Sequence, residues 1–253
     1  MRIPCSLLAL AFASTLIASA PTGASAAGPD ARPDVVAAMG MRAEVRSLAA
    51  ACEEKTGSYG WLFRWSEHFW EGGNLAALRH ADRYAAALGP DDRRSLQGSV
   101  EAYAAQARAT PDGPLPAGPV DLPLCEELLR QLQDPEHRHD LLGRDVAQRL
   151  AAAYAVERGS REAVRLEERH EDMVIGCMKS ALKQGQREIA PARATCECVI
   201  AAVEGAATTA EIDAYNAATN GPAGRTGAQA DVMNAPWLQA ALPKMQACAA
   251  KGR

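Results

Sequence analysis

The chain has 253 residues and a formal net charge of −4, with 27 lysine and arginine residues against 31 aspartate and glutamate residues. This mild acidity, with no cluster of basic residues, argues against nucleic acid or an anionic membrane surface as the main partner, because both are bound by clustered lysine and arginine. The alanine-rich composition, poor in β-branched residues, favours helix along the whole chain. The sequence therefore predicts an all-α fold.

Residues 1–26 are predicted to be a secretory signal peptide. Arg2 precedes an apolar stretch from Leu7 to Ile17, and Ala24-Ser25-Ala26 supplies the small residues of a cleavage site. Cleavage after Ala26 would remove one of the seven cysteines, Cys5, and leave six. No later segment of the sequence is apolar for long enough to span a bilayer. We therefore expect a soluble periplasmic or secreted protein.

Residues 27–140 are expected to form an N-terminal helical unit. Apolar side chains recur at three- and four-residue spacing from Val35 to Glu54, which is typical of a first helix. Asn74 is a favourable N-cap for a helix that runs to Leu88, and a further helix follows Pro90. The stretch Pro111–Pro119 holds four prolines, which cannot continue a helix, and therefore predicts a long loop.

Residues 141–253 are expected to form a second helical unit of antiparallel helices, poorly separated from the first. In the densely charged stretch Glu157–Asp172, Glu157 and Arg161 stand four residues apart, and so do Arg158 and Glu162. Such pairs are typical of a solvated helix, so this stretch is expected to connect the two units. Further signals are an amphipathic stretch (Leu141–Ala155), a helix start (Pro191), a capping box (Thr208–Glu211) and a last helix (Pro236–Ala250).

The six remaining cysteines predict a disulfide framework, because their count is even and the chain is expected to be exported. Cys125 lies on a short predicted helix, Leu122–Leu132, and a bridge to Cys52 would close the N-terminal unit over the proline-rich loop. Cys177 and Cys196 each share a stripe with apolar residues. Facing stripes favour a Cys177–Cys196 bridge and leave Cys198 for Cys248, while the exchanged pairing remains an open alternative.

Two other functions for the second group of cysteines are a redox-active Cys196-x-Cys198 pair and a soft-metal site with Met173 and Met178 as thioether ligands. No thioredoxin-like βαβ pattern surrounds the pair, and both methionines occupy positions typical of core residues. The sequence therefore favours structural disulfides.

Histidines give a second candidate site. His137 and His139 are two residues apart, and with His170 they could supply ligands to zinc. Their surroundings are more typical of a polar turn, and the sequence contains neither His-Glu-x-x-His nor Cys-x-x-Cys. Glu67 and His68 could act as an acid/base pair, although no nucleophile motif accompanies them. We therefore expect no metal and no cofactor.

The aromatic stretch Tyr59–Trp70 is the most distinctive part of the sequence. Trp61, Trp65 and Phe69 stand four residues apart, as on one face of a helix, and Trp70 follows. One interpretation is that these side chains anchor the core of the N-terminal unit. The other is that Trp61, Trp65, Phe69 and Trp70 form an exposed surface for a protein partner, since tryptophan and tyrosine are enriched at interface hot spots.

These features favour a disulfide-stapled helical protein without catalysis that binds another envelope or secreted protein, as an adaptor or as an inhibitor or immunity-type protein. The alternative is a small exported enzyme, either a hydrolase or a redox or metal-dependent protein. Its site would use His137, His139 or the Cys196/Cys198 pair.

Overall fold

The computed structural model describes residues 31–110, 113–134, 139–220 and 234–251, and the described part of the chain is helical, without strands. The all-α prediction is confirmed. The predicted signal peptide, residues 1–26, lies outside the described residues. The helices are α1 (Ala31–Thr56), the 3-10 turn η1 (Gly57–Tyr59), α2 (Trp61–Gly73), α3 (Leu75–Ala87), α4 (Pro90–Ala109), α5 (Leu122–Gln133), α6 (Arg144–Glu157), α7 (Arg161–Lys183), α8 (Ile189–Glu204), α9 (Thr209–Asn220) and α11 (Pro236–Lys251).

Local signals in the sequence explain where several helices begin. Pro90 opens α4 at a position where its missing N–H costs nothing. The Asp121 carboxylate accepts the Leu124 N–H at the start of α5, and the Ser160 hydroxyl accepts the Ala163 N–H at the start of α7. Thr208 and Glu211 exchange hydrogen bonds ahead of α9, so the predicted capping box is confirmed.

Asn74 does not cap α3 with its side chain, contrary to the sequence prediction. Its side-chain amide donates to the Trp70 carbonyl in the preceding helix, and its side-chain oxygen lies 2.8 Å from Nδ1 of His139. The buried Asn74 therefore links the end of α2 to the segment that leads into α6.

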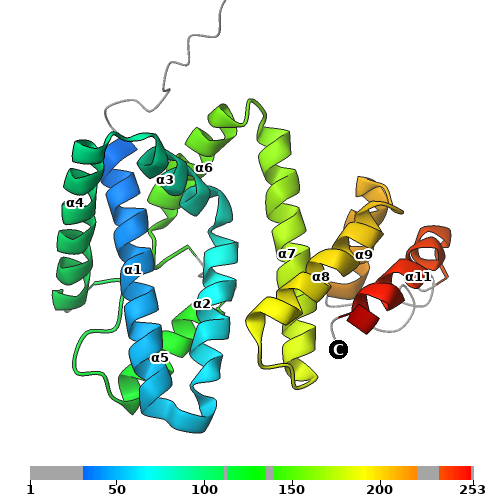
Figure 1. The fold of residues 1–253 in the computed structure, drawn as a ribbon, viewed down its shortest axis with the longest axis horizontal. Helices are drawn as coiled ribbons and strands as arrows, with labels where there is room; N and C mark the ends of the chain where they lie inside the picture. Colours follow the sequence, from blue (N-terminus) through cyan, green and yellow to red (C-terminus); the bar gives the residue numbers. More distant parts are fainter. Residues whose placement is uncertain (1–30, 111–112, 135–138, 221–233, 252–253) are drawn as a thin grey trace, which may run out of the picture.

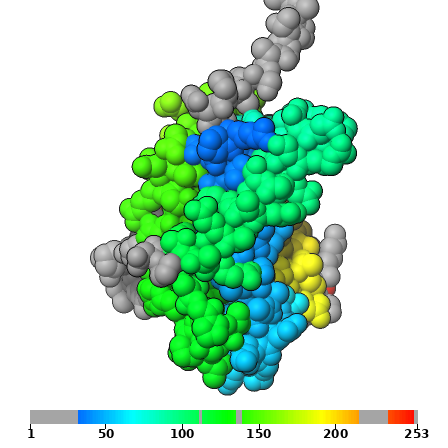
Figure 2. Space-filling model, turned by 90° about the vertical axis from the view of Figure 1, so that its left-hand side faces the viewer, coloured from blue at the N-terminus to red at the C-terminus, as the bar shows by residue number. Residues whose placement is uncertain are grey.

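Helix α1 is the centre of the first group of helices, α1–α6 (Figure 1). It packs against α2, α3, α4, α5 and α6, and α4 and α5 lie beside it on the face seen in Figure 2. Its buried side chains recur every three or four residues, so one continuous apolar stripe meets all these neighbours. The stripe consists of Val35, Ala38, Met41, Val45, Leu48 and Cys52.

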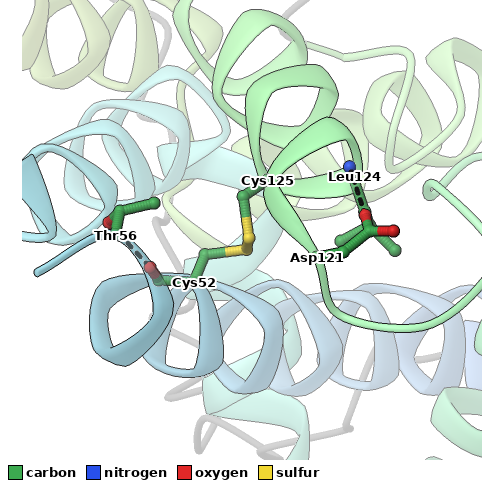
Figure 3. The surroundings of a disulfide bond; sticks show 5 residues. All are labelled: Cys52, Thr56, Asp121, Leu124 and Cys125. Atoms are coloured by element: carbon green, nitrogen blue, oxygen red, sulfur yellow. Dashed lines mark hydrogen bonds between the residues drawn. A yellow bond between two sulfur atoms is a disulfide. The ribbon is translucent and has the colours of Figure 1, made fainter.

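The first disulfide closes this group of helices. Cys52 near the end of α1 is bonded to Cys125 in α5, as predicted, and both residues are fully buried (Figure 3). Nearby, the Thr56 hydroxyl donates to the Cys52 carbonyl, and Asp121 caps the helix that carries Cys125. The proline-rich loop also belongs to this core, because Leu115 packs into it.

Helix α6 packs with this first group. Leu141, Leu142, Ala147 and Leu150 belong to the apolar core around α1. Further along α6, Tyr154 and Ala155 pack with Val164 of α7, so α6 contacts both groups of helices.

The second group of helices begins with α7, which stands between α1–α6 and the helices α8, α9 and α11 (Figure 1). Cys177 in α7 is bonded to Cys196 in α8, and Cys198 in α8 is bonded to Cys248 in α11, which is the pairing that the apolar stripes favour. Within the described residues, no helix is long and apolar enough to cross a membrane.

Candidate functional site

A charged cleft of about 500 Å³ lies where α7 and α8 meet α3 and α9. Its volume falls within the range of about 300–1,000 Å³ that is usual for ligand sites. Its lining combines apolar and charged side chains. It is lined by Leu75, Arg79, Leu166, Glu167, Arg169, His170, Glu171, Arg193, Glu197, Glu204, Ala207, Thr209 and Ile212.

The buried ion pair of Glu171 and Arg193 forms one end of this cleft. Glu171 in α7 is only 3% exposed, and both of its carboxylate oxygens accept hydrogen bonds from Arg193 in α8, at 2.7 and 2.6 Å. Burial raises the pKa of Glu171, but the hydrogen bonds and charge of Arg193 outweigh burial, and the pKa is lowered overall. The carboxylate therefore remains ionised in a position that water barely reaches.

The close approach of α2 to α7 explains why Glu171 is buried. At Gly72 in α2, a Cβ atom would lie 2.5 Å from Cδ1 of Ile175 and 2.9 Å from a carboxylate oxygen of Glu171. A side chain larger than that of glycine would therefore require the ends of the Ile175 and Glu171 side chains to move.

His68 in α2 completes the arrangement around Arg193. Nη1 of Arg193 lies 3.1 Å from Nε2 of His68, and because a guanidinium can only donate, this histidine nitrogen accepts. Burial and the charge of Arg193 lower the pKa of His68. His68 is therefore held neutral, with its proton on the other ring nitrogen.

Glu167 connects three helices at the other end of the cleft. It accepts a hydrogen bond from the Tyr154 hydroxyl at 2.8 Å and pairs with Arg79 of α3 at 2.8 Å and with Arg158 at 2.6 Å. Burial raises the pKa of Glu167, but Tyr154 and the two arginines outweigh it, and the pKa is lowered overall. This carboxylate is also fixed in its ionised form.

Two further pairs line the middle of the cleft. Nδ1 of His170 in α7 lies 2.9 Å from the carboxylate of Glu204 at the end of α8. Arg169 pairs with Asp213 of α9 and donates to the Thr209 hydroxyl. Together with the pair of Arg193 and Glu197, these contacts give every arginine and glutamate that lines the cleft a partner, which is an oppositely charged side chain for all of them except Glu204, whose partner is His170.

Glu67 and His68, the candidate acid/base pair, point to different neighbours. Glu67 lies 3.2 Å from Arg46 of α1, whereas His68 faces Arg193. Burial and the nearby Glu71 raise the pKa of Glu67 above its usual range. Successive residues of a helix point about 100° apart, so these two groups do not act on one atom.

The aromatic stretch forms helix α2, and its faces enter two different cores. Phe63 and Trp70 pack into the core around α1, whereas Trp65 packs against Val174 and Met178 of α7. Residues 63 and 70 are two turns apart on one face, while residue 65 points about 200° away from residue 63. The prediction of a core anchor for the N-terminal unit is therefore incomplete, because Trp65 anchors the second group of helices.

The partner-surface interpretation of this stretch is corrected for Trp65 and Trp70, since both are buried. Trp65 also donates from its indole nitrogen to the Arg187 carbonyl at 3.0 Å. Trp61 and Phe69 are half-buried and are covered by cations, because the Arg187 guanidinium lies 3.9 Å from the Trp61 ring centre and the Lys179 ammonium 5.3 Å from that of Phe69.

The cysteines and methionines are used in packing. Cys196 and Cys198 belong to two different disulfides and do not form a pair with each other, as a redox-active Cys-x-Cys would. Met178 is fully buried beside Trp65, and Met173 packs against the same cluster.

Of the three predicted histidine ligands, His137 lies outside the described residues. His139 contacts Asn74, and His170 contacts Glu204, so these two do not converge. The residues that the structure describes contain no group of three or more side chains suited to a metal ion.

Sequence reasoning did not identify Glu171 or Arg193 as site residues, and it predicted the wrong partners for the neighbouring charged residues. Glu157 lies 2.8 Å from Nδ1 of His80, and Arg158 pairs with Glu167, because a turn at residues 158–160 separates α6 from α7. The sequence did contain one indication that Glu171 has a buried partner. Glu171 falls on the same stripe of α7 as Val164, Val174 and Met178, where an unpaired carboxylate would be costly.

The fold and the site together define an all-α, disulfide-bridged protein with a charged cleft between helices. Neither a family model, nor a curated protein, nor a solved structure matches the chain.

Proposed function

We propose that the chain is an exported protein without catalysis that binds another secreted or envelope protein, as an adaptor or an inhibitor. The observation that carries this proposal is the cleft in which each lining arginine and glutamate already has a side-chain partner, ionic for all but Glu204, which contacts His170. The three disulfides support export, because disulfides persist in oxidising compartments, and so does the predicted signal peptide.

The paired charges suit binding better than proton transfer. A general acid or base must exchange its proton with a substrate, whereas Glu167 and Glu171 are fixed in their ionised forms by arginines. Side chains that are already ordered lose little conformational entropy when a partner binds. The cleft therefore offers a preorganised polar surface together with apolar side chains.

Leu166 gives this surface an apolar contact point. It is 40% exposed although it is a large apolar residue, and it lines the cleft together with Leu75. Partner residues that insert an apolar side chain between these leucines would also meet the surrounding charge pairs. Apolar contact at the centre with a polar rim is the usual composition of a protein interface.

Site-specific photo-crosslinking tests the proposal in cells that produce the protein. A photoreactive residue in place of Leu166 is expected to give a discrete adduct with one protein. The matched control replaces Tyr59, which is 68% exposed and does not line the cleft. If Leu166 gives no adduct, or if both positions give the same adducts, the cleft is not the binding surface.

One contact favours an enzyme as the second candidate. Glu204 orients His170 in the cleft, and a carboxylate that orients a histidine is a common arrangement for a general base. A hydrolase of this kind would lose its activity on p-nitrophenyl esters when His170 is replaced by glutamine. If the wild type and His170→Gln hydrolyse the esters at the same rate, this alternative is excluded.

A further inference from the structure

The three disulfides differ sharply in their access to solvent. Cys52, Cys125 and Cys196 are buried, and Cys177 is half-buried. Cys198 in α8 is exposed, although its partner Cys248 is buried. Thiol–disulfide exchange requires a thiolate to reach a disulfide sulfur, and Cys198 is the one exposed residue among these six cysteines.

The Cys198–Cys248 bridge joins α8 to α11, the last helix of the described chain. Helix α11 packs on α8, and its buried residues Leu238 and Ala241 lie outside the apolar clusters that the structure shows around α1, Trp65 and Tyr154. Pro243 lies inside α11 and removes one backbone hydrogen bond from it. The bridge is thus a covalent cross-link that ties α11 to α8 in addition to their packing.

We propose that Cys198–Cys248 is a site of thiol–disulfide exchange with a dithiol, and that its reduction releases α11 from α8. One thiolate of the dithiol attacks the Cys198 sulfur, the Cys198–Cys248 bond breaks, and Cys248 leaves as a thiolate that takes up a proton. The second thiol of the dithiol then loses its proton and attacks the dithiol sulfur that is bonded to Cys198, and Cys198 leaves as a thiolate that takes up this proton. Both cysteines end reduced, and the dithiol becomes a disulfide.

Release of α11 changes one face of α8 and leaves the rest of the bundle bridged. Ala202 stands one turn after Cys198 on the same face and is buried in the oxidised protein. Reduction would expose this face, while the Cys177–Cys196 bridge continues to join α7 to α8. Reduction of this disulfide would therefore expose a surface of α8 that is covered by α11 in the oxidised protein.

Graded reduction of the full chain with dithiothreitol, followed by alkylation and mass spectrometry, tests the order of reduction. Cys198 and Cys248 are expected to become alkylated at about tenfold lower dithiothreitol concentration than Cys52 and Cys125, because of the difference in access. The proposal is wrong if Cys52–Cys125 or Cys177–Cys196 is reduced first.

Hydrogen exchange on the selectively reduced protein tests the release of α11. Amide exchange in α11 is expected to rise about tenfold or more, with no change in α1. The oxidised Cys198→Ser/Cys248→Ser variant should show the same pattern, whereas the control Cys177→Ser/Cys196→Ser should keep α11 protected. Unchanged exchange in α11 after loss of the bridge would overturn the proposal, and exchange in α1 reports whether each variant has kept its fold.

Discussion

Helices α1–α6 bury a continuous apolar stripe along α1, whereas α7 and α8 bury a small apolar group that Trp65 of α2 completes. The first group contains one disulfide, and both of its cysteines are fully buried. The second contains two disulfides, one of them with an exposed cysteine, and the buried ion pair of Glu171 and Arg193 lies against it.

This difference shows two ways in which helices are held together. A long apolar stripe stabilises a bundle through buried area, in proportion to the surface removed from water. A group with little apolar area needs other links, because small cores supply little net stability. Here those links are covalent bridges, charge pairs and an aromatic side chain from the neighbouring group.

The largest effect is expected from two of the three disulfides, one taken from each group of helices. Loop-closure entropy predicts a loss of about 4.4 kcal/mol for Cys52→Ser/Cys125→Ser and about 3.2 kcal/mol for Cys177→Ser/Cys196→Ser, since the sequence separations are 73 and 19 residues. Urea unfolding followed by circular dichroism measures both losses. If the loss is larger for Cys177→Ser/Cys196→Ser than for Cys52→Ser/Cys125→Ser, the second group depends on its bridge more than loop length implies.

Loss of the buried charge pair is expected to have the next largest effect. Arg193→Met leaves the Glu171 carboxylate buried without its main partner, which should cost about 3 kcal/mol at pH 7. The double variant Arg193→Met/Glu171→Gln should recover part of this loss. Arg94→Met, which removes an exposed pair with Asp91, is the control and should change nothing measurable. An equal loss in the single and double variants would contradict the assigned role of Glu171.

A helix cap in the first group should have a smaller effect. Asp121→Ala removes the acceptor for the Leu124 N–H and should cost about 1 kcal/mol in urea unfolding. Asp121→Asn retains an N-cap side chain and should lose much less. If both variants lose the same free energy of unfolding, the negative charge of Asp121 matters more than its hydrogen bond to the Leu124 N–H.

The smallest effect is expected to be a gain in stability. The pKa of Glu67 is raised in the folded protein, so the folded state binds this proton more tightly than the unfolded state does. The wild-type protein therefore loses stability as pH rises through the raised pKa and Glu67 becomes ionised. Glu67→Gln keeps the neutral form at every pH and should add less than about 1 kcal/mol at pH 7. The gain should vanish below the ordinary glutamate pKa of about 4.3, where the wild-type residue is also neutral. Unfolding at pH 7 and pH 3.5 measures it, and a loss at pH 7 would contradict the sign.

Much of the fold could be predicted from the sequence, because helices and their starts are local. The spacing of apolar residues predicted α1, and the apolar stripes around Cys177 and Cys196 favoured the pairing that the structure has. The cleft could not be predicted in the same way. Periodicity identifies the buried face of a helix but not the helix that covers it, and the Glu171 to Arg193 contact joins residues 22 positions apart.

The aromatic stretch shows the same limit. The spacing of Trp61, Trp65 and Phe69 predicted that they share one face of a helix, and all three do pack with the same apolar cluster beside α7 and α8. The spacing did not show that Phe63 and Trp70, on another face of α2, enter the core around α1. The direction in which each side chain of α2 points can be predicted from helix geometry. That a second core lies in one of these directions cannot, because it is formed by α7 and α8.

The central claim, that Trp65 organises α7 and α8, is tested most directly by hydrogen exchange on two variants. Trp65→Ala should raise amide exchange in α7 and α8 and leave α4 and α5 protected. Leu128→Ala, in the core around α1, should do the reverse. If Trp65→Ala instead loosens α1–α6 while α7 and α8 remain protected, Trp65 belongs to the first core and the account is wrong.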